Sequence, residues 1–275
     1  MTTWQSASLQ SNGIRLHYTR TGGDKPPIVL AHGFSDDGMC WIEVARALEG
    51  DYDLIMPDAR GHGRSEGPES GYTPQDMAAD LAGLIEQLGL ERPAVFGHSM
   101  GAQTTLTLAA LYPEKVGAIL LEDPPPWWMP ELTQAALNDP SRPAKRRADI
   151  VEMKRHTSAE LIERQRQATP HWSESELETW AEAKLRLSFN LLNRPIAPDL
   201  EWGELLRKIT CPSLLISADP SLGGMVTPEA AQGLQERIPQ LEIATIDGAG
   251  HCIHRDKFEQ TMQAVRAFLN KHYPA

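Results

Sequence analysis

The sequence predicts an α/β protein built on a mostly parallel sheet with helices on both faces. Short, uninterrupted apolar runs such as residues 28–30 and 54–56 are typical of parallel strands that are buried on both sides. Patterns typical of amphipathic helices separate these runs, and strands that alternate with helices favour parallel pairing. With 275 residues, of which 41% are hydrophobic and 23% charged, the chain is long enough to bury a large core.

The predicted strands begin near the N-terminus. Residues 14–20 alternate between apolar and polar in the manner of a half-buried strand, and Asn12-Gly13 before them is a hairpin turn signal. After the two apolar runs already named, further strands are expected at residues 95–96, 118–121, 214–216 and 241–246.

Two helices have clear sequence signals. Thr73 is a helix N-cap followed by Pro74 at the first helical position and an acidic Asp76, and this pattern predicts a helix that runs to Leu88 and stops at Gly89. Near the C-terminus, an apolar stripe at the spacing of one helix face predicts a final helix. The stripe consists of Phe258, Met262, Val265 and Leu269.

The segment 124–200 interrupts the alternation of strands and helices. It contains four of the seven tryptophans and no convincing strand, and its 11 basic residues balance its 11 acidic ones. A neutral, helical, tryptophan-rich insertion between two strands is interpreted as a lid over a site. The expected organisation is therefore a first part of the core over 1–123, a helical lid over 124–200 and a second part of the core over 201–275.

The composition excludes several classes of partner and cofactor. A net charge of −11 argues against nucleic acid or an anionic membrane as a partner, since both require a basic surface. The cysteines at 40, 211 and 252 are scattered and show no metal-ligand spacing, so neither a disulfide framework nor a metal site is expected. The sequence contains no signal peptide and no apolar run long enough to span a membrane, and a cytoplasmic location is the expectation.

The pentapeptide 97–101, which reads GHSMG, lies between a predicted strand and a helix expected over 102–111. Gly-x-Ser-x-Gly in that context indicates a nucleophile elbow, in which Ser99 is exposed at the tip of a sharp turn. Gly97 and Gly101 are expected because neighbouring backbone passes close to the turn. The free N–H groups at the start of the helix favour a developing negative charge at the same place.

The segment 31–34, which reads AHGF, follows an earlier strand and predicts the rest of an oxyanion hole. A tetrahedral intermediate carries an oxyanion that is best held by two preorganised N–H donors. We expect these donors to be the backbone N–H groups of Met100, just after the serine, and of Phe34.

A serine nucleophile also needs a base and a carboxylate that orients the base. His251 lies in a glycine-containing loop after the last strand, and Asp219 follows the strand before it. In hydrolases with a nucleophile elbow, the serine, the acid and the histidine follow one another in this order along the chain, as Ser99, Asp219 and His251 do here. Asp123 also follows a predicted strand and is the alternative acid. Asp219 is favoured, although the loop through 221–224 departs from the short loop that usually follows the acid.

Taken together, these motifs resemble the α/β-hydrolases of the esterase/lipase-like group that includes proline iminopeptidases, lactonases and cofactor-free haloperoxidases. The matching stretches are HGF (32–34), PDARGHGRS (57–65), GHSMG (97–101), LISADP (215–220) and GAGHCIH (248–254). The resemblance implies the α/β-hydrolase fold and a Ser–Asp–His serine hydrolase without a cofactor. Related haloalkane dehalogenases and epoxide hydrolases would require an aspartate at position 99, so the serine disfavours both.

The expected activity is hydrolysis of a small to medium carboxylic ester or lactone through an acyl-enzyme on Ser99. An amide, peptide or carbon–carbon bond hydrolase of the same fold and a slow-turnover ligand-binding receptor are the alternatives. The lid carries the candidate substrate-binding residues Trp127, Trp128, Trp172 and Trp180. Arg146 and Arg147 are interpreted as part of a solvated helix face, because acidic residues lie nearby in the sequence.

Overall fold

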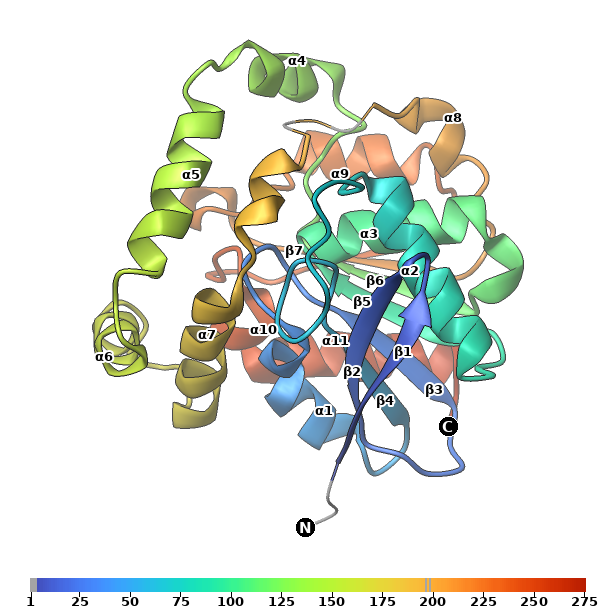
Figure 1. Cartoon of the computed structure of the whole chain (residues 1–275). Helices are drawn as coiled ribbons and strands as arrows, with labels where there is room; N and C mark the ends of the chain where they lie inside the picture. Colours follow the sequence, from blue (N-terminus) through green and yellow to red (C-terminus); the bar gives the residue numbers. More distant parts are fainter. Residues whose placement is uncertain (1–3, 196, 198) are drawn as a thin grey trace.

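A single mixed sheet forms the centre of the protein (Figure 1). The computed structural model describes residues 4–195, 197 and 199–275, and within them the strand order is β1-β2-β4-β3-β5-β6-β7-β8. The strands are β1 (Gln5–Ser11), β2 (Ile14–Arg20), β3 (Pro27–Ala31), β4 (Asp53–Pro57), β5 (Ala94–His98), β6 (Ala118–Glu122), β7 (Ser213–Ser217) and β8 (Leu241–Thr245). All neighbours from β4 to β8 are parallel, so the predicted fold class is confirmed.

The antiparallel edge of the sheet is a hairpin of β1 and β2. Asn12 and Gly13 both have positive φ, at 45° and 79°, which is the backbone that a tight two-residue hairpin requires. The turn was predicted, but β1 was not. Its sequence, QSASLQS, is mostly polar because one face of this edge strand is exposed, and only Ala7 and Leu9 pack on the core.

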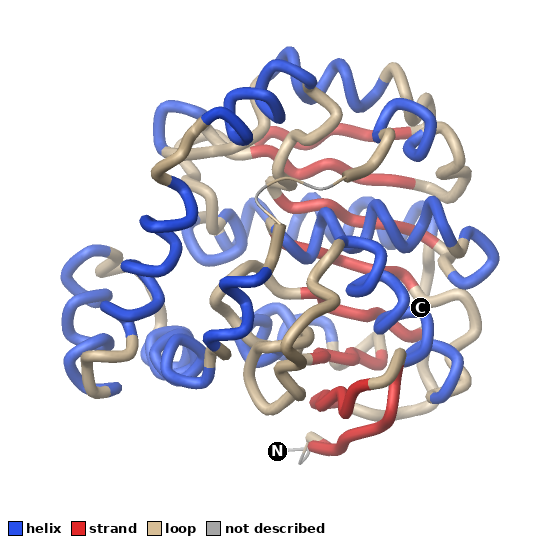
Figure 2. Tube along the Cα trace, turned by 45° about the horizontal axis from the view of Figure 1, so that its top comes forward, coloured by secondary structure: helices blue, strands red, loops and turns tan. Residues whose placement is uncertain are grey.

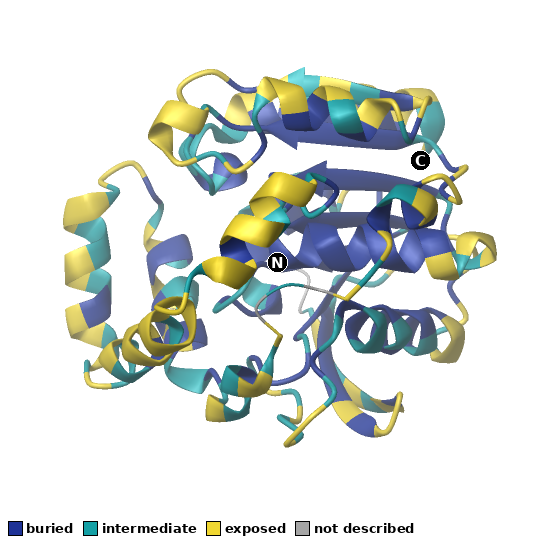
Figure 3. Ribbon diagram, turned by 90° about the horizontal axis from the view of Figure 1, so that it is seen from above, coloured by how far each residue is buried: buried dark blue, intermediate teal, exposed yellow. Residues whose placement is uncertain are grey.

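Helices cover both faces of the sheet (Figure 2). On one face, α2 (Pro74–Gln87), α3 (Met100–Leu111), α8 (Trp202–Leu206) and α9 (Pro228–Gln235) share one apolar core with the strands. On the other, α1 (Ile42–Leu48) and α11 (Phe258–His272) share a second. The strands β3 to β7 are almost wholly buried, whereas the edge strands β1 and β8 are partly exposed (Figure 3). Thr73 and Asp76 form the capping box that starts α2, as predicted.

Between β6 and β7 the chain forms α4 (Pro130–Asn138), α5 (Arg142–Met153), α6 (Ser158–Ala168) and α7 (Glu174–Arg186), and the described residues there contain no strand. Capping boxes at Thr157 and Ser173 start α6 and α7. A buried ion pair joins α7 to the loop after β3, because Lys184 Nζ lies 2.7 Å from Asp36 Oδ1. Asp36 also pairs with Arg255, just before α11, at 3.2 Å.

Among the described residues, none of these helices combines the length and the apolar character needed to cross a membrane.

Candidate active site

The turn between β5 and α3 holds Ser99 in an unusual backbone conformation. Its φ is 51° and its ψ −112°, a region that a non-glycine residue enters only when the surrounding structure enforces it. A Cβ on Gly97 would lie 2.4 Å from the Gly101 carbonyl oxygen, and one on Gly101 would lie 2.0 Å from that of Ala31. The prediction that both glycines are needed for close backbone approach is confirmed.

Ser99 is the first member of a hydrogen-bonded chain of three side chains. His251 Nε2 lies 2.9 Å from Ser99 Oγ, and His251 Nδ1 lies 2.6 Å from Asp123 Oδ2. A carboxylate can only accept here, so Nδ1 carries the proton and Nε2 is free to accept the proton of Ser99. The Asp123 side chain is fully buried, whereas that of His251 is 33% exposed and can face a substrate.

The expectation that Asp219 orients His251 is therefore wrong. Asp219 caps a short 3-10 turn, Pro220–Leu222, by accepting hydrogen bonds from the N–H and hydroxyl of Ser221. These hydrogen bonds also lower the pKa of Asp219. Its carboxylate is thus held in its own loop and does not reach His251.

Asp123 occupies the acid position because of the loop that follows Asp219. The backbone N–H groups of Met225 and Val226 donate to the Asp123 carboxylate at 2.9–3.1 Å. Asp123 has a φ of 43°, which turns its side chain out of β6 toward His251. The two signals in the sequence were the aspartate directly after a strand and the extended loop at 221–224.

The expected oxyanion donors lie next to Ser99. Phe34, Ser99 and Met100 line the same cavity. Met100 is the first residue of α3, where a helix has no internal acceptor for its N–H. Within the described residues, the N–H groups of Phe34 and Met100 both lack an acceptor, so both remain available to a ligand.

The cavity above Ser99 has a volume of about 710 Å³ and lies between the carboxyl ends of the strands and the helices α4 and α5. One wall is mainly apolar and consists of Pro125, Trp127, Leu132, Ala135, Ala136 and Met225. The other is charged and consists of Asp139, Arg142, Lys145, Arg146, Asp149 and Arg194. The size suits a small or medium organic molecule with both apolar and charged groups.

Of the four tryptophans expected to bind substrate, Trp127 alone lines this cavity. Trp128 is buried and donates from Nε1 to the Ala230 carbonyl, which joins the segment to α9. Trp172 stacks on Arg255 and so joins the inserted segment to the core. The ring centre of Trp180 lies 5.0 Å from Lys184 Nζ of the same helix, α7. The interpretation of Arg146 as solvated is also wrong, since it lines the cavity.

A model of the family described as "alpha/beta hydrolase fold" matches residues 26–258. The chain belongs to this family. It is 28% identical to an N-formylmaleamate deformylase from Pseudomonas putida, over 96% of each chain. It is also 29% identical to epoxide hydrolase A of Mycobacterium tuberculosis, over 95% of this chain and 96% of the relative.

A solved E-2-(acetamidomethylene)succinate hydrolase superposes with a TM-score of 0.82 at 22% identity. The superposition covers 98% of this chain and all of that one, which shows that the two share the fold.

Behind the triad, this α/β-fold hydrolase has a buried polar network that holds His251. His98 Nε2 lies 2.9 Å from the His251 carbonyl and therefore donates to it. Burial lowers the pKa of His98 to about 3, so its ring is neutral at physiological pH. Glu122, next to Asp123, accepts from the N–H and the ring of His254, which places His254 in this buried network. Burial alone would raise the pKa of Glu122, but these histidines outweigh it and hold the pKa at about 2.

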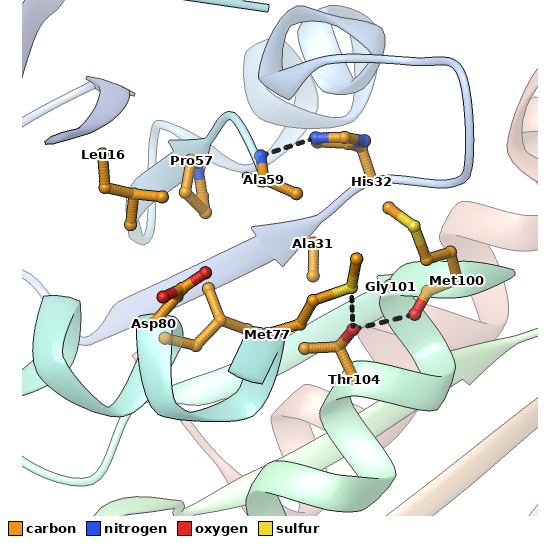
Figure 4. Close-up of a pocket in the computed structure, with 11 residues that line it drawn as sticks. Leu16, Ala31, His32, Pro57, Ala59, Met77, Asp80, Met100, Gly101 and Thr104 are labelled. Carbon is orange, nitrogen blue, oxygen red and sulfur yellow. Dashed lines mark hydrogen bonds between the residues drawn. The ribbon is translucent and has the colours of Figure 1, made fainter. Parts of the chain in front are cut away.

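A second cavity of this hydrolase lies beneath the elbow, between β3, α2 and α3 (Figure 4). Its volume is about 20 Å³, which is room for about one water molecule and no substrate. Met77 and Thr104 face it, and Thr104 Oγ1 donates to the Met100 carbonyl at 3.0 Å. This hydroxyl ties the first turn of α3 together directly below Ser99.

Burial raises the pKa of Cys252, the neighbour of His251, to about 12, so its thiol stays protonated. Within the described part of the chain, no group of three or more His, Cys, Asp or Glu side chains is placed to hold a metal ion.

Proposed function

We propose that this protein is a serine hydrolase that cleaves a small to medium carboxylic ester or lactone through an acyl-enzyme on Ser99. The observation that carries the proposal is the hydrogen-bonded chain from Ser99 through His251 to Asp123 at the floor of the cavity. The segment 124–200 serves as the lid over that cavity, between core parts 1–123 and 201–275.

The first half-reaction forms the acyl-enzyme. Ser99 Oγ attacks the substrate carbonyl carbon while its proton passes to His251 Nε2. Asp123 stabilises the imidazolium, and the N–H groups of Phe34 and Met100 stabilise the oxyanion. His251 then protonates the leaving alcohol as the tetrahedral intermediate collapses.

In the second half-reaction, water attacks the acyl carbon. His251 takes a proton from the water, a second tetrahedral intermediate forms in the same oxyanion hole, and Ser99 leaves as its hydroxyl. No group outside the chain is required.

The relatives bear on the choice of bond. Opening an epoxide by this fold would require an aspartate at the elbow, so Ser99 argues against that activity despite the epoxide hydrolase relative. The deformylase relative supports a second candidate, hydrolysis of an N-acyl bond, since its name describes an N-formyl substrate. The same residues would serve, with His251 protonating a leaving nitrogen.

The test is hydrolysis of a chain-length series of p-nitrophenyl esters, a set of lactones and a set of N-formyl and N-acetyl amides. Wild type is compared with Ser99→Ala, and covalent labelling by a fluorophosphonate is followed by intact mass. We expect ester turnover and one label per chain, both lost in Ser99→Ala. Amide turnover without ester turnover would favour the second candidate. A folded protein that is neither labelled nor active would favour a receptor and refute the proposal.

A further inference from the structure

The charged wall of the catalytic cavity is unusual for this protein. The chain carries a net charge of −11, yet the described residues that line the cavity include four cationic and two anionic side chains. Asp149, Arg142 and Lys145 are exposed, and Asp139 accepts hydrogen bonds from the N–H and hydroxyl of Ser141. Arg146 and Arg194 are half-buried, and neither forms an ion pair with a carboxylate of the described residues.

Arg194 lies beside two other residues that line the site, Gln103 and Phe34. Its Nη2 donates to Gln103 Oε1 at 3.0 Å, and its guanidinium lies 5.9 Å from the centre of the Phe34 ring. Arg146 Nη1 donates to the Arg194 carbonyl at 2.7 Å, which holds this segment in place. Burial, and next the charge of Arg146, lowers the pKa of Arg194 to about 10, so the guanidinium is still protonated at neutral pH.

Other buried cations of the protein are paired with carboxylates. Arg60 pairs with Asp80, and both Lys184 and Arg255 pair with Asp36. Arg194 makes no ion pair with any residue the structure describes, and its hydrogen-bond partner is the neutral amide of Gln103. A desolvated charge without a counter-ion is costly, and a bound anion would remove that cost.

Arg194 is linked to the reaction centre through α3. Gln103, which holds the guanidinium, donates its backbone N–H to the Ser99 carbonyl one helical turn earlier. Residues one turn apart lie on the same side of a helix, so the guanidinium is held on the side of α3 that carries Ser99. The guanidinium is a planar donor that matches a carboxylate in a bidentate geometry.

We propose that the substrate carries a carboxylate a few bonds from the scissile carbonyl and that Arg194 binds this carboxylate, with Arg146 as a positioning residue. This inference rests on the proposed hydrolase function and names its substrate class. The apolar wall, with Trp127 and Leu132, then contacts the remainder of the molecule.

The test uses pairs of esters that differ only in charge. Monomethyl glutarate and 4-acetoxybutyrate place a carboxylate on the acyl and leaving-group sides, and their neutral twins have a primary amide instead. The measured quantity is the ratio of kcat/KM between the charged ester and its twin. The variants are Arg194→Gln, Arg194→Lys and Arg147→Gln, the last an exposed arginine of α5 outside the cavity. Binding of glutarate to Ser99→Ala, measured by calorimetry with and without Arg194→Gln, gives a readout that needs no turnover.

We expect wild type to favour at least one carboxylate ester, and the preference to fall about 10- to 100-fold in Arg194→Gln. Arg194→Lys should retain part of it and Arg147→Gln all of it. Equal turnover of charged and neutral esters by wild type would overturn the inference and leave the hydrolase function standing. Glutarate binding that depends on Arg194, without turnover of any ester, would support the anion site and count against the hydrolase. Absence of both turnover and glutarate binding would overturn the inference.

Discussion

Replacing Asp123 with asparagine tests the triad at its least expected member. Asparagine is close in size to aspartate and tolerates the positive φ of 43° at this position, so the backbone need not move. Its Oδ1 can still accept from Met225 and Val226, which donate to Asp123 Oδ1 at 3.0 and 3.1 Å. The chemical change falls on the second oxygen, which becomes an amide NH₂ that faces His251 Nδ1 and can no longer accept from the Met225 N–H, which lies 2.9 Å from Asp123 Oδ2.

The amide of Asp123→Asn would reverse the tautomer of His251, that is, which ring nitrogen carries the proton. An NH₂ group donates, so Nδ1 must become the acceptor and Nε2 must carry the proton, which points it at Ser99 Oγ. His251 can then no longer accept the serine proton. The same exchange in a well-studied serine protease triad lowers kcat by about 10⁴-fold, and a loss of that order is expected here. It corresponds to about 5 kcal/mol of lost transition-state stabilisation.

The assay is kcat/KM on the best p-nitrophenyl ester, together with the rate of fluorophosphonate labelling. Asp219→Asn is the matched control, because asparagine also serves as a cap for the turn at Pro220–Leu222. We expect the control to stay within about twofold of wild type, as is usual away from a site. If Asp219→Asn lost activity by orders of magnitude while Asp123→Asn retained it, the assignment of the acid would be refuted.

Three further predictions concern stability and reactivity. Burial, and next the charge of Asp58, raises the pKa of Asp37 to about 7. The native state therefore holds this proton more tightly than the unfolded chain and loses stability as pH rises from about 4 to 7. Asp37→Asn should remove that loss, seen as a gain in Tm at pH 8 that is absent at pH 4, and an equal effect at both pH values would contradict it. Gly101→Ala should lower the free energy of unfolding by at least about 3 kcal/mol in urea, because its Cβ would overlap the Ala31 carbonyl. Gly203→Ala, which has open space around it, should leave that free energy unchanged, and similar unfolding midpoints for the two variants would disprove the close approach. Cys252→Ala should keep ester turnover within about twofold of wild type. The native thiol should resist alkylation at pH 8, and rapid modification would show that its pKa is not raised.

Local patterns in the sequence were sufficient for most of the sheet. Apolar runs that lie inside β3 to β7 could be recognised because a strand covered on both faces needs continuous hydrophobicity. The edge strand β8, which is partly exposed, was also recognised, within one residue of its end. The polar strand β1 escaped notice because an edge strand with one solvated face resembles a loop. The elbow was recognisable because the turn imposes a short-range demand for glycine on both sides of Ser99.

The sequence by itself determined the fold and was sufficient to select Ser99 and His251 as the candidate nucleophile and base, since each signal lies in residues close together in the chain. The tertiary structure decided which of two aspartates faces His251, because that depends on how the 219–226 loop folds and where the N–H groups of Met225 and Val226 point. It likewise decided that Arg146 and Arg194, 48 residues apart, meet at one wall of the cavity. Contacts between distant segments leave no local pattern in the sequence, because the two partners become neighbours only when the chain has folded.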